Sequence, residues 1–328
     1  MISAKELHAQ LMVVNGTDAS PVDTVLLERM TKGGLTCNVV YGGTNLQDTE
    51  DLHQYIRDHS DDLVLATSVR QIREAKRQGK ITIVFNWQHA NPIGPDEGLL
   101  EVYQRLGISI CGLCYNVRNL IGDGCCERTE GGLSLFGERV VRKINELRMV
   151  LDIGGHTSEA TSWDALQVAK GPVVCTHTNC RALRNNPRCM TDDFMRAIAA
   201  RGGVIGITCY GYFVTDKPTA TLDLFLDHID HAVRTAGVDH VGIALDQIVY
   251  PPPPPGTPDE EVQDDPYVTP TPRAYPKSSD QWYTRGLETV GETPNITEGL
   301  MRRGYSPTDI GKIMGENWLR VYEQVWGS

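Results

Sequence analysis

Three side chains with metal-binding chemistry each follow a different short apolar run of the sequence: His156, His177 and Asp246. A further apolar run ends in Asn86-Trp87-Gln88-His89. Imidazole nitrogen and carboxylate oxygen are donors that zinc and similar divalent ions prefer in proteins. If the runs are parallel strands of one sheet, their ends meet, and the sequence then predicts a divalent metal site there. Imidazoles that only cap loops by hydrogen bonding are the alternative interpretation.

The apolar runs alternate with segments of helical periodicity, which is typical of βα units around a parallel sheet. Strands are expected at residues 11–14, 36–40, 81–85, 108–113, 149–153, 173–175, 204–208 and 241–245. Helices are expected at residues 24–30, 49–59, 68–78, 99–106, 135–147, 162–169, 191–200, 222–236, 296–303 and 307–325. Eight strands in alternation with helices predict an α/β fold of the (β/α)8 TIM-barrel class with a C-terminal helical extension. In this class of barrel, the active residues lie where the strands end.

The size and composition of the chain fit one such barrel. Its 328 residues lie within the roughly 200 to 400 residues of known barrels. With 40% hydrophobic and 22% charged residues, the chain can bury a large core, and we expect one domain over residues 1–328. The formal net charge of −11 disfavours binding to phosphate backbones and anionic lipid. Nucleic acid and membrane partners are therefore not expected.

The cysteines and the start of the chain bear on location. Nine cysteines are an odd number, and in a chain of this length they indicate buried or reactive thiols in a reducing compartment. Lys5, Glu6 and His8 stand where a signal peptide would need an apolar core. No segment approaches the roughly 20 apolar residues of a spanning helix. We therefore expect a cytoplasmic protein.

One segment of low complexity follows the eighth expected strand. Residues 250–280 contain five consecutive prolines, an acidic run over residues 259–265 and further prolines. Such a tract forms neither helix nor strand. Because it follows a strand end, we expect a proline-rich loop that covers the barrel mouth as a lid, or else a tolerated surface insertion.

Several motifs resemble those of the membrane (renal) dipeptidase family. Thr-His-Thr-Asn-Cys-Arg-Ala-Leu at residues 176–183 precedes Pro187-Arg188, and further matches lie at residues 202–206, 239–243 and 315–321. The resemblance covers most of the chain. It implies a (β/α)8 barrel that hydrolyses dipeptides with two bridged zinc ions, and it suggests a homodimer, because family members commonly dimerise.

The resemblance also implies roles for individual residues. His156 and His177 fall on the histidines that bind one zinc ion of the family. Arg188 falls on the arginine that holds the substrate carboxylate, and Asp246 falls on the carboxylate that serves as general acid and base. These roles are chemically sensible, because metal-bound water has a lowered pKa and a guanidinium pairs with a carboxylate through two parallel hydrogen bonds.

Other positions depart from the family pattern. Where the family has Asp-Gly-His-x-Asp after its first strand, this chain has Asn15-Gly16-Thr17-Asp18-Ala19. Gln88 stands at the position of the bridging glutamate, and a neutral amide does not balance two dications. The sequence therefore predicts one zinc ion rather than two, with Asp18 and Gln88 as the remaining candidates for additional ligands.

Further candidates lie in the loops after the fourth and seventh expected strands. The segment from Tyr115 to Cys125 resembles a loop of divergent bacterial dipeptidase-like proteins. We expect Tyr115, Asn116 and Tyr210 to line the substrate pocket. The Cys111-x-x-Cys114 pair is interpreted as buried, whereas the thiols of Cys125 and Cys126 are alternative nucleophiles if an imidazole serves as their base.

Three functions are compatible with these residues. The first is a dipeptidase-like metal-dependent hydrolase that acts on a dipeptide or small amide with a free carboxylate. The second is an enzyme of the same fold that uses one metal ion or none for a lyase, isomerase or cyclisation step on an amino-acid-derived metabolite. The third is a non-catalytic protein that binds such a ligand.

Overall fold

The structure is a computed structural model that describes residues 2–247 and 282–327. Its strands are β1 (Val14–Asp18), β2 (Cys37–Tyr41), β3 (Leu63–Leu65), β4 (Ile81–Trp87), β5 (Ile108–Gly112), β6 (Val150–Asp152), β7 (Val174–Thr178), β8 (Val204–Ile207), β9 (Ala220–Thr221), β10 (Val241–Ile243) and β11 (Thr284–Arg285). The proline-rich lid predicted at residues 250–280 lies outside the described residues.

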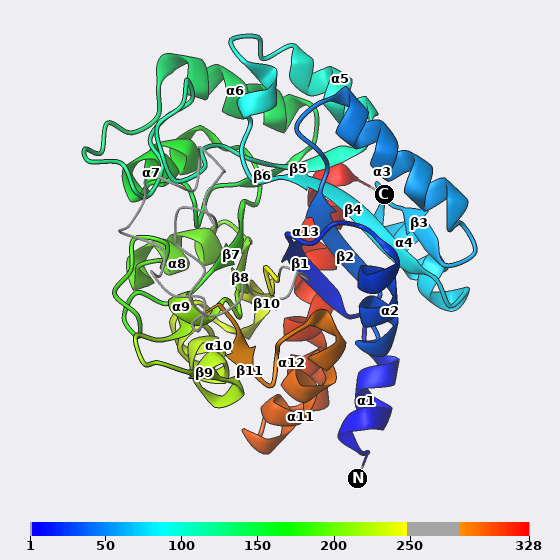
Figure 1. The fold of residues 1–328 in the computed structure, drawn as a ribbon. Helices are drawn as coiled ribbons and strands as arrows, with labels where there is room; N and C mark the ends of the chain where they lie inside the picture. Colours follow the sequence, from blue (N-terminus) through cyan, green and yellow to red (C-terminus); the bar gives the residue numbers. More distant parts are fainter. Residues whose placement is uncertain (1, 248–281, 328) are drawn as a thin grey trace.

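The main sheet follows the order β1-β2-β4-β5-β6-β7-β8-β10, all in parallel, and β3 adds to β4. The first and last strands of this order also meet. Asp246 N donates to Thr17 O over 3.1 Å, and Ala19 N donates to Gln247 O over 3.1 Å. The eight-strand path is therefore a nearly closed barrel with helices around it (Figure 1), which confirms the predicted (β/α)8 fold.

Helices cover the outside of this barrel (Figure 1). They are α1 (Ala4–Gln10), α2 (Thr24–Lys32), α3 (Leu46–Asp58), α4 (Val69–Arg77), α5 (Leu99–Arg105), α6 (Leu135–Glu146), α7 (Glu159–Val168), α8 (Asp192–Ala200), α9 (Gly211–Val214), α10 (Leu222–Ala236), α11 (Pro294–Arg302), α12 (Pro307–Gly311) and α13 (Asn317–Trp326). Polar N-caps fix where many of them begin, as Ser134 does for α6 by accepting from Gly137 N over 2.9 Å.

The barrel interior is filled by apolar side chains from all eight strands of the path. These are Val14, Val39, Val84, Ile110, Val150, Val174, Val204 and, just after β10, Ala244. They pack against Trp318, Leu319 and Tyr322 of α13, together with Met12 and Cys37 from the N-terminal ends of the strands. Helix α13 thus closes the N-terminal end of the barrel, and the polar residues lie toward the other end.

The structure shifts several expected boundaries. The first strand was expected at residues 11–14, but β1 spans Val14–Asp18, and β7 extends to Thr178 rather than ending at residue 175. His177 therefore lies inside a strand. Polar residues such as Thr17 and His177 resemble loop residues in the sequence, but neighbouring strands satisfy their backbone and side-chain groups. Strand β3 and helix α1 were not predicted, and the expected helix at residues 307–325 contains a π-helical turn at Lys312–Glu316.

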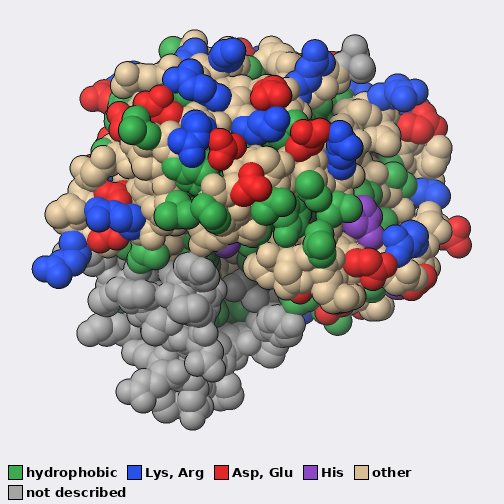
Figure 2. Space-filling model, turned by 90° about the horizontal axis from the view of Figure 1, so that it is seen from above, with side chains coloured by type: hydrophobic (Ala, Val, Ile, Leu, Met, Phe, Trp, Pro, Cys, Tyr) green, Lys and Arg blue, Asp and Glu red, His purple; other side chains and the backbone are tan. Residues whose placement is uncertain are grey.

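Charges of both signs are intermingled on the face shown in Figure 2. Elsewhere in the described residues, ion pairs connect opposite charges, for example Arg139 with Glu97 over 2.9 Å and Arg142 with Glu138 over 3.0 Å. Among the described residues, no helix is both long and apolar enough to cross a membrane.

A buried histidine on α10 predicts a loss of stability in acid. His228 Nε2 lies 2.8 Å from Val214 O, and its Nδ1 accepts from Cys180 N over 3.0 Å. Burial lowers the pKa of His228 to about 4, against about 6.5 for an exposed histidine. Between these two pH values, the unfolded chain therefore binds more protons than the folded chain. The stability that neutral His228 contributes is complete above about pH 6.5 and is lost as the pH falls to 4.

Between pH 7.5 and pH 4.5, we expect the unfolding free energy of the wild type to fall by about 2 kcal/mol more than that of a His228→Gln variant, because glutamine does not titrate. Urea unfolding at several pH values measures both proteins. Parallel loss of stability in the two proteins would contradict the assignment.

Candidate active site

Two imidazoles from neighbouring strands face one another at the barrel mouth. His156 follows β6 and His177 lies in β7, and their Nε2 atoms are 3.0 Å apart. Both rings are buried. Burial, and next the positive charge of Arg188, hold the pKa of each histidine well below its usual range. Both rings are therefore neutral at pH 7, the form that binds metal ions.

Each imidazole ring is oriented by a hydrogen bond at Nδ1, on the side of the ring that faces away from the mouth. Asn116 Oδ1 lies 2.8 Å from His156 Nδ1, so an Nδ1–H donates to this amide oxygen and the Nε2 lone pair faces the mouth. His177 Nδ1 lies 2.9 Å from Thr176 Oγ1, which in turn donates to Asp152 Oδ2 over 2.5 Å. Burial raises the pKa of Asp152 to about 6 despite its hydrogen bonds with Thr176.

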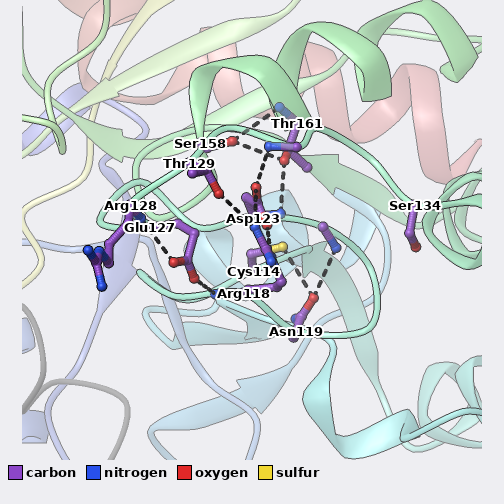
Figure 3. A network of polar contacts seen from close by, with 12 residues as sticks. Cys114, Arg118, Asn119, Asp123, Glu127, Arg128, Thr129, Ser134, Ser158 and Thr161 are labelled. Atoms are coloured by element: carbon purple, nitrogen blue, oxygen red, sulfur yellow. Dashed lines mark hydrogen bonds and ion pairs between the residues drawn. The ribbon is translucent and has the colours of Figure 1, made fainter.

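The loop between β5 and α6, which carries Asn116, is anchored by Asp123 (Figure 3). The buried Asp123 carboxylate accepts from Arg118 Nε and from Gly131 N, each over 2.5 Å. Its backbone N donates to Thr161 Oγ1 at the start of α7 over 3.0 Å. Burial opposes ionisation, but the bonds from Arg118 and Gly131 keep the pKa of Asp123 below its usual value. This network holds the loop that orients His156.

Arg188 brings a buried positive charge to the pair. Its side chain is 1% exposed, Nη2 lies 3.3 Å from His156 Nε2, and Cζ lies 5.0 Å from the centre of the Phe213 ring. Gly155, at φ 67°, makes room for it, because a Cβ there would lie 2.4 Å from Arg188 Nη1. The backbone N of Arg188 donates to Asn186 Oδ1 over 2.8 Å.

Asp246 lies on the other side of His177. Its Oδ2 is 3.8 Å from His177 Nε2, and its backbone has φ 53°, a left-handed conformation that is rare outside glycine. Burial raises the pKa of Asp246 to about 7; Arg188 opposes this rise and Asp18 adds to it. A carboxyl group that titrates near neutral pH is suited to proton transfer.

The candidate ligand Asp18 is part of a buried hydrogen-bond network. Asp18 Oδ2 accepts from Asn15 Nδ2 over 3.3 Å and from Asn38 Nδ2 over 3.2 Å, while Oδ1 accepts from Ser20 N over 2.9 Å. Burial, which outweighs these bonds, raises its pKa. Thr17 nearby accepts from Asn86 Nδ2 over 3.3 Å. Neutral amides and a hydroxyl thus fill the region where the family pattern has a histidine and an aspartate.

The other predicted site residues are placed as follows. Tyr115 stacks on His156 with ring centres 3.8 Å apart, and Asn116 supports the same ring from behind. Tyr210, at the N-terminus of α9, lines a hollow together with Asp246. Gln88 follows β4 and is nearly buried, with no hydrogen bond from its side chain to any described residue.

The donor set fits one metal ion better than two. The two Nε2 atoms of His156 and His177 are close enough to bind one zinc ion together. Within residues 2–247 and 282–327, however, no group of three or more His, Cys, Asp or Glu side chains is arranged to hold a metal. Thr17, Ala19 and Gln88 supply no anionic donor at the positions where the family pattern has ligands of a second ion.

Eight of the nine cysteines are buried, and Cys125 is partly exposed. Cys111 and Cys114 are fully buried, as predicted. The Cys125 thiol lies 3.6 Å from Asn116 Oδ1 and 3.7 Å from Cys126 Sγ. Burial and the neighbouring Cys126 raise the pKa of Cys125 well above its usual value. A thiol that remains protonated at neutral pH is a poor nucleophile, so the structure does not support the alternative of thiol catalysis.

Asp152 is a positioning residue that the sequence did not reveal. It lies within the strand expected at residues 149–153, and its carboxyl group accepts from both the backbone N and the hydroxyl of Thr176. A lone acidic residue inside the otherwise apolar run Met149 to Ile153 was the available signal, because a buried carboxyl group needs partners.

Metal-dependent hydrolases of the (β/α)8 class place their site residues at the barrel mouth, which is where this barrel places the histidine pair, Arg188 and Asp246. The sequence profile of the membrane dipeptidase family (peptidase family M19) matches residues 41–259 and 278–326. The chain belongs to this family, whose members are metal-dependent, and this confirms the predicted resemblance.

Three relatives illustrate the similarity. Dipeptidase verJ of Clonostachys rogersoniana is 29% identical over 85% of this chain, and dipeptidase tcpJ of Claviceps purpurea (strain 20.1) is 27% identical over 84%. The chain spans only 64% and 58% of the lengths of these two proteins. The crystal structure of an amidohydrolase from Pseudomonas aeruginosa matches with a TM-score of 0.91 and 32% identity, and the match covers 100% of both chains.

Proposed function

We propose that the protein is a metal-dependent hydrolase that cleaves a dipeptide or another small amide with a free carboxylate. One observation carries the proposal: Arg188, His156, His177 and Asp246 follow one another across the mouth through contacts of 3.3, 3.0 and 3.8 Å. These contacts place a buried cation, two neutral imidazoles and a carboxyl group that titrates near pH 7 side by side in one row across the mouth. The relatives named dipeptidases support the choice of reaction.

His156 and His177 would hold one zinc ion through their Nε2 atoms. Such an ion supplies a bound water of lowered pKa and polarises the carbonyl group of the amide. Asn116 and Thr176 keep both rings in the tautomer that directs Nε2 to the mouth. Metal binding and imidazole orientation therefore depend on residues that do not touch the substrate.

Arg188 binds the substrate, and Asp246 transfers the protons. The Arg188 guanidinium donates two parallel hydrogen bonds to the substrate carboxylate, which fixes the position of the amide. Asp246 accepts a proton from the attacking water at a carboxylate oxygen and returns it to the leaving amine. A pKa of about 7 suits both transfers, because the group gains and loses the proton readily near neutral pH.

Metal content and hydrolysis together test this proposal. Protein purified without chelator is expected to contain about one zinc ion per chain and to hydrolyse a dipeptide, but not the same dipeptide with its carboxylate converted to an amide. His177→Ala is expected to lose both zinc and activity. Two zinc ions per chain, or no hydrolysis of either L,L or L,D dipeptides, would contradict it. Zinc binding without hydrolysis would favour a lyase, isomerase or cyclisation reaction instead.

A further inference from the structure

Two adjacent cysteines in the loop between β5 and α6 hold their thiols side by side. Cys125 Sγ lies 3.7 Å from Cys126 Sγ, and within the described residues neither thiol is part of a disulfide. Cys125 is partly exposed and Cys126 is 8% exposed. The other cysteines are buried as single thiols or deeper in the fold. The Cys125–Cys126 pair is therefore the dithiol that a solute can reach.

An open cleft leads to the Cys125–Cys126 pair. The cleft has a volume of about 770 Å³, and its lining includes Cys125, Glu127, Glu159, Arg181 and Asn186. None of the four residues in the row across the barrel mouth lines this cleft. The pair is thus accessible from a pocket that is distinct from the proposed catalytic row.

The spacing of the two sulfurs fits one bridging atom. Two sulfurs bonded to one tetrahedral atom at about 2.3 Å, as in zinc thiolate sites, lie about 3.8 Å apart. A disulfide instead needs sulfurs about 2.05 Å apart and Cα atoms usually about 4.4–6.8 Å apart, whereas the Cα atoms of adjacent residues are only about 3.8 Å apart. The observed 3.7 Å therefore favours a bridged dithiol over a disulfide.

Backbone hydrogen bonds hold the pair in this arrangement. Cys125 N donates to His156 O over 2.8 Å, and Cys126 N donates to Asn116 O over 2.7 Å. The carboxylate of the next residue, Glu127, accepts from two backbone N–H groups of the same loop over 3.2 and 2.9 Å (Figure 3). Because the loop already fixes both cysteines, a ligand that bridges them has little ordering left to impose.

The chemistry of the pair favours trivalent arsenic over a divalent metal ion. Within residues 2–247 and 282–327, no group of three or more His, Cys, Asp or Glu side chains is arranged to hold a metal. Burial and the neighbouring Cys126 raise the pKa of the Cys125 thiol, and a divalent ion needs thiolates. A trivalent arsenical with one organic group needs only two sulfurs and reacts with protonated thiols by releasing water.

We propose that Cys125 and Cys126 form a binding site for monosubstituted trivalent arsenicals. The hydrated arsenical carries two hydroxyl groups on arsenic. Each As–O bond breaks as an As–S bond forms, and each hydroxyl group leaves as water with the proton of one thiol. Arsenic stays trivalent throughout, so the step needs no oxidant or reductant.

The bridged pair is also expected to affect His156. His156 Nδ1–H donates to Asn116 Oδ1 over 2.8 Å, and this amide oxygen lies 3.6 Å from Cys125 Sγ. Bonding of Cys125 Sγ to arsenic changes the contact with the amide that orients the ring. In metal-free protein, the NMR signals of the His156 ring are therefore expected to shift when the arsenical saturates the pair. Unmoved signals would contradict this coupling.

Mass spectrometry of the intact chain with phenylarsine oxide tests the site. One adduct per chain is expected under native conditions. It should survive excess 2-mercaptoethanol, which offers a single thiol, and be removed by 2,3-dimercaptopropanol, which offers two. Trypsin cleavage after Arg118 and Arg128 gives a peptide of residues 119–128, which contains Cys125 and Cys126 and no other cysteine. No adduct on the folded protein, or arsenic on a different peptide, would overturn the proposal.

The Cys125→Ser and Cys126→Ser variants are each expected to bind phenylarsine oxide at least tenfold more weakly, because only one thiol of the pair remains. Cys180→Ser is the matched control: burial and next the Cys189 thiol raise the pKa of Cys180, so these two thiols are also neighbours, but both are buried. This control should bind as the wild type does. Unchanged binding by Cys126→Ser would contradict a two-thiol site, and the peptide that carries arsenic in the wild type decides the question if a variant fails to fold.

Discussion

The Asp246→Asn variant is expected to lose about 10²- to 10⁴-fold in kcat, the range typical of a removed general acid or base. Asparagine has nearly the same shape but cannot accept a proton from water or return one to the leaving amine. Binding of a carboxylate-bearing ligand is expected to stay within about threefold of the wild type, because Arg188 is untouched. Steady-state kinetics with a dipeptide and calorimetry with a ketomethylene isostere of Ala-Ala, which has no scissile amide, measure the two properties.

The backbone at Asp246 makes asparagine the informative substitution. Its φ of 53° is tolerated by asparagine better than by any other residue apart from glycine, so the backbone conformation is retained. The substitution also removes the cost of ionising a buried carboxyl group whose pKa is raised to about 7, so stability at pH 8 should not fall. A fall in kcat of less than tenfold, or an equal loss of ligand affinity, would contradict the assigned role.

The barrel could be predicted from the sequence because its signal is repeated eight times. Each strand has a β-branched run, and the order of strands and helices alone favours a closed barrel over an open sheet. The boundaries were less predictable where strands extend into the mouth. Residues such as Thr17 and Thr178 have the composition of loops, and only the pairing of β1 with β2 and of β7 with β8 makes them strand residues.

The site was predictable in part, for a different reason. His156, His177 and Asp246 could be found because each follows an apolar run, and strand ends of a barrel converge. Asp152 could not, because its significance depends on a partner in three dimensions, the Thr176 of the neighbouring strand. The sequence also shows that Thr17, Ala19 and Gln88 are poor metal ligands. It does not show that the Asp18 carboxylate accepts hydrogen bonds from side-chain amides.

The Arg188→Met variant is expected to weaken the binding of a carboxylate ligand by about 10²-fold while kcat falls less than tenfold. Two charge-assisted hydrogen bonds are lost, and bonds of this kind contribute about 1.5–3 kcal/mol each. Methionine keeps much of the side-chain volume against Phe213. Arg188→Lys is the matched control, since it retains the charge but not the planar fork, and it should bind with intermediate affinity.

Thermal stability separates this anchoring role from a structural one. Arg188 is a buried cation, and moving a guanidinium out of water is costly, so its replacement by an apolar side chain is expected to leave the Tm unchanged or to raise it. Removing the positive charge next to Nε2 also raises the pKa of His156 and His177, because Arg188 is the second cause, after burial, of their low values. Titration of the histidines by NMR would detect this rise. A lowered Tm, or equal losses in kcat and affinity, would mean that Arg188 holds the site together rather than the substrate.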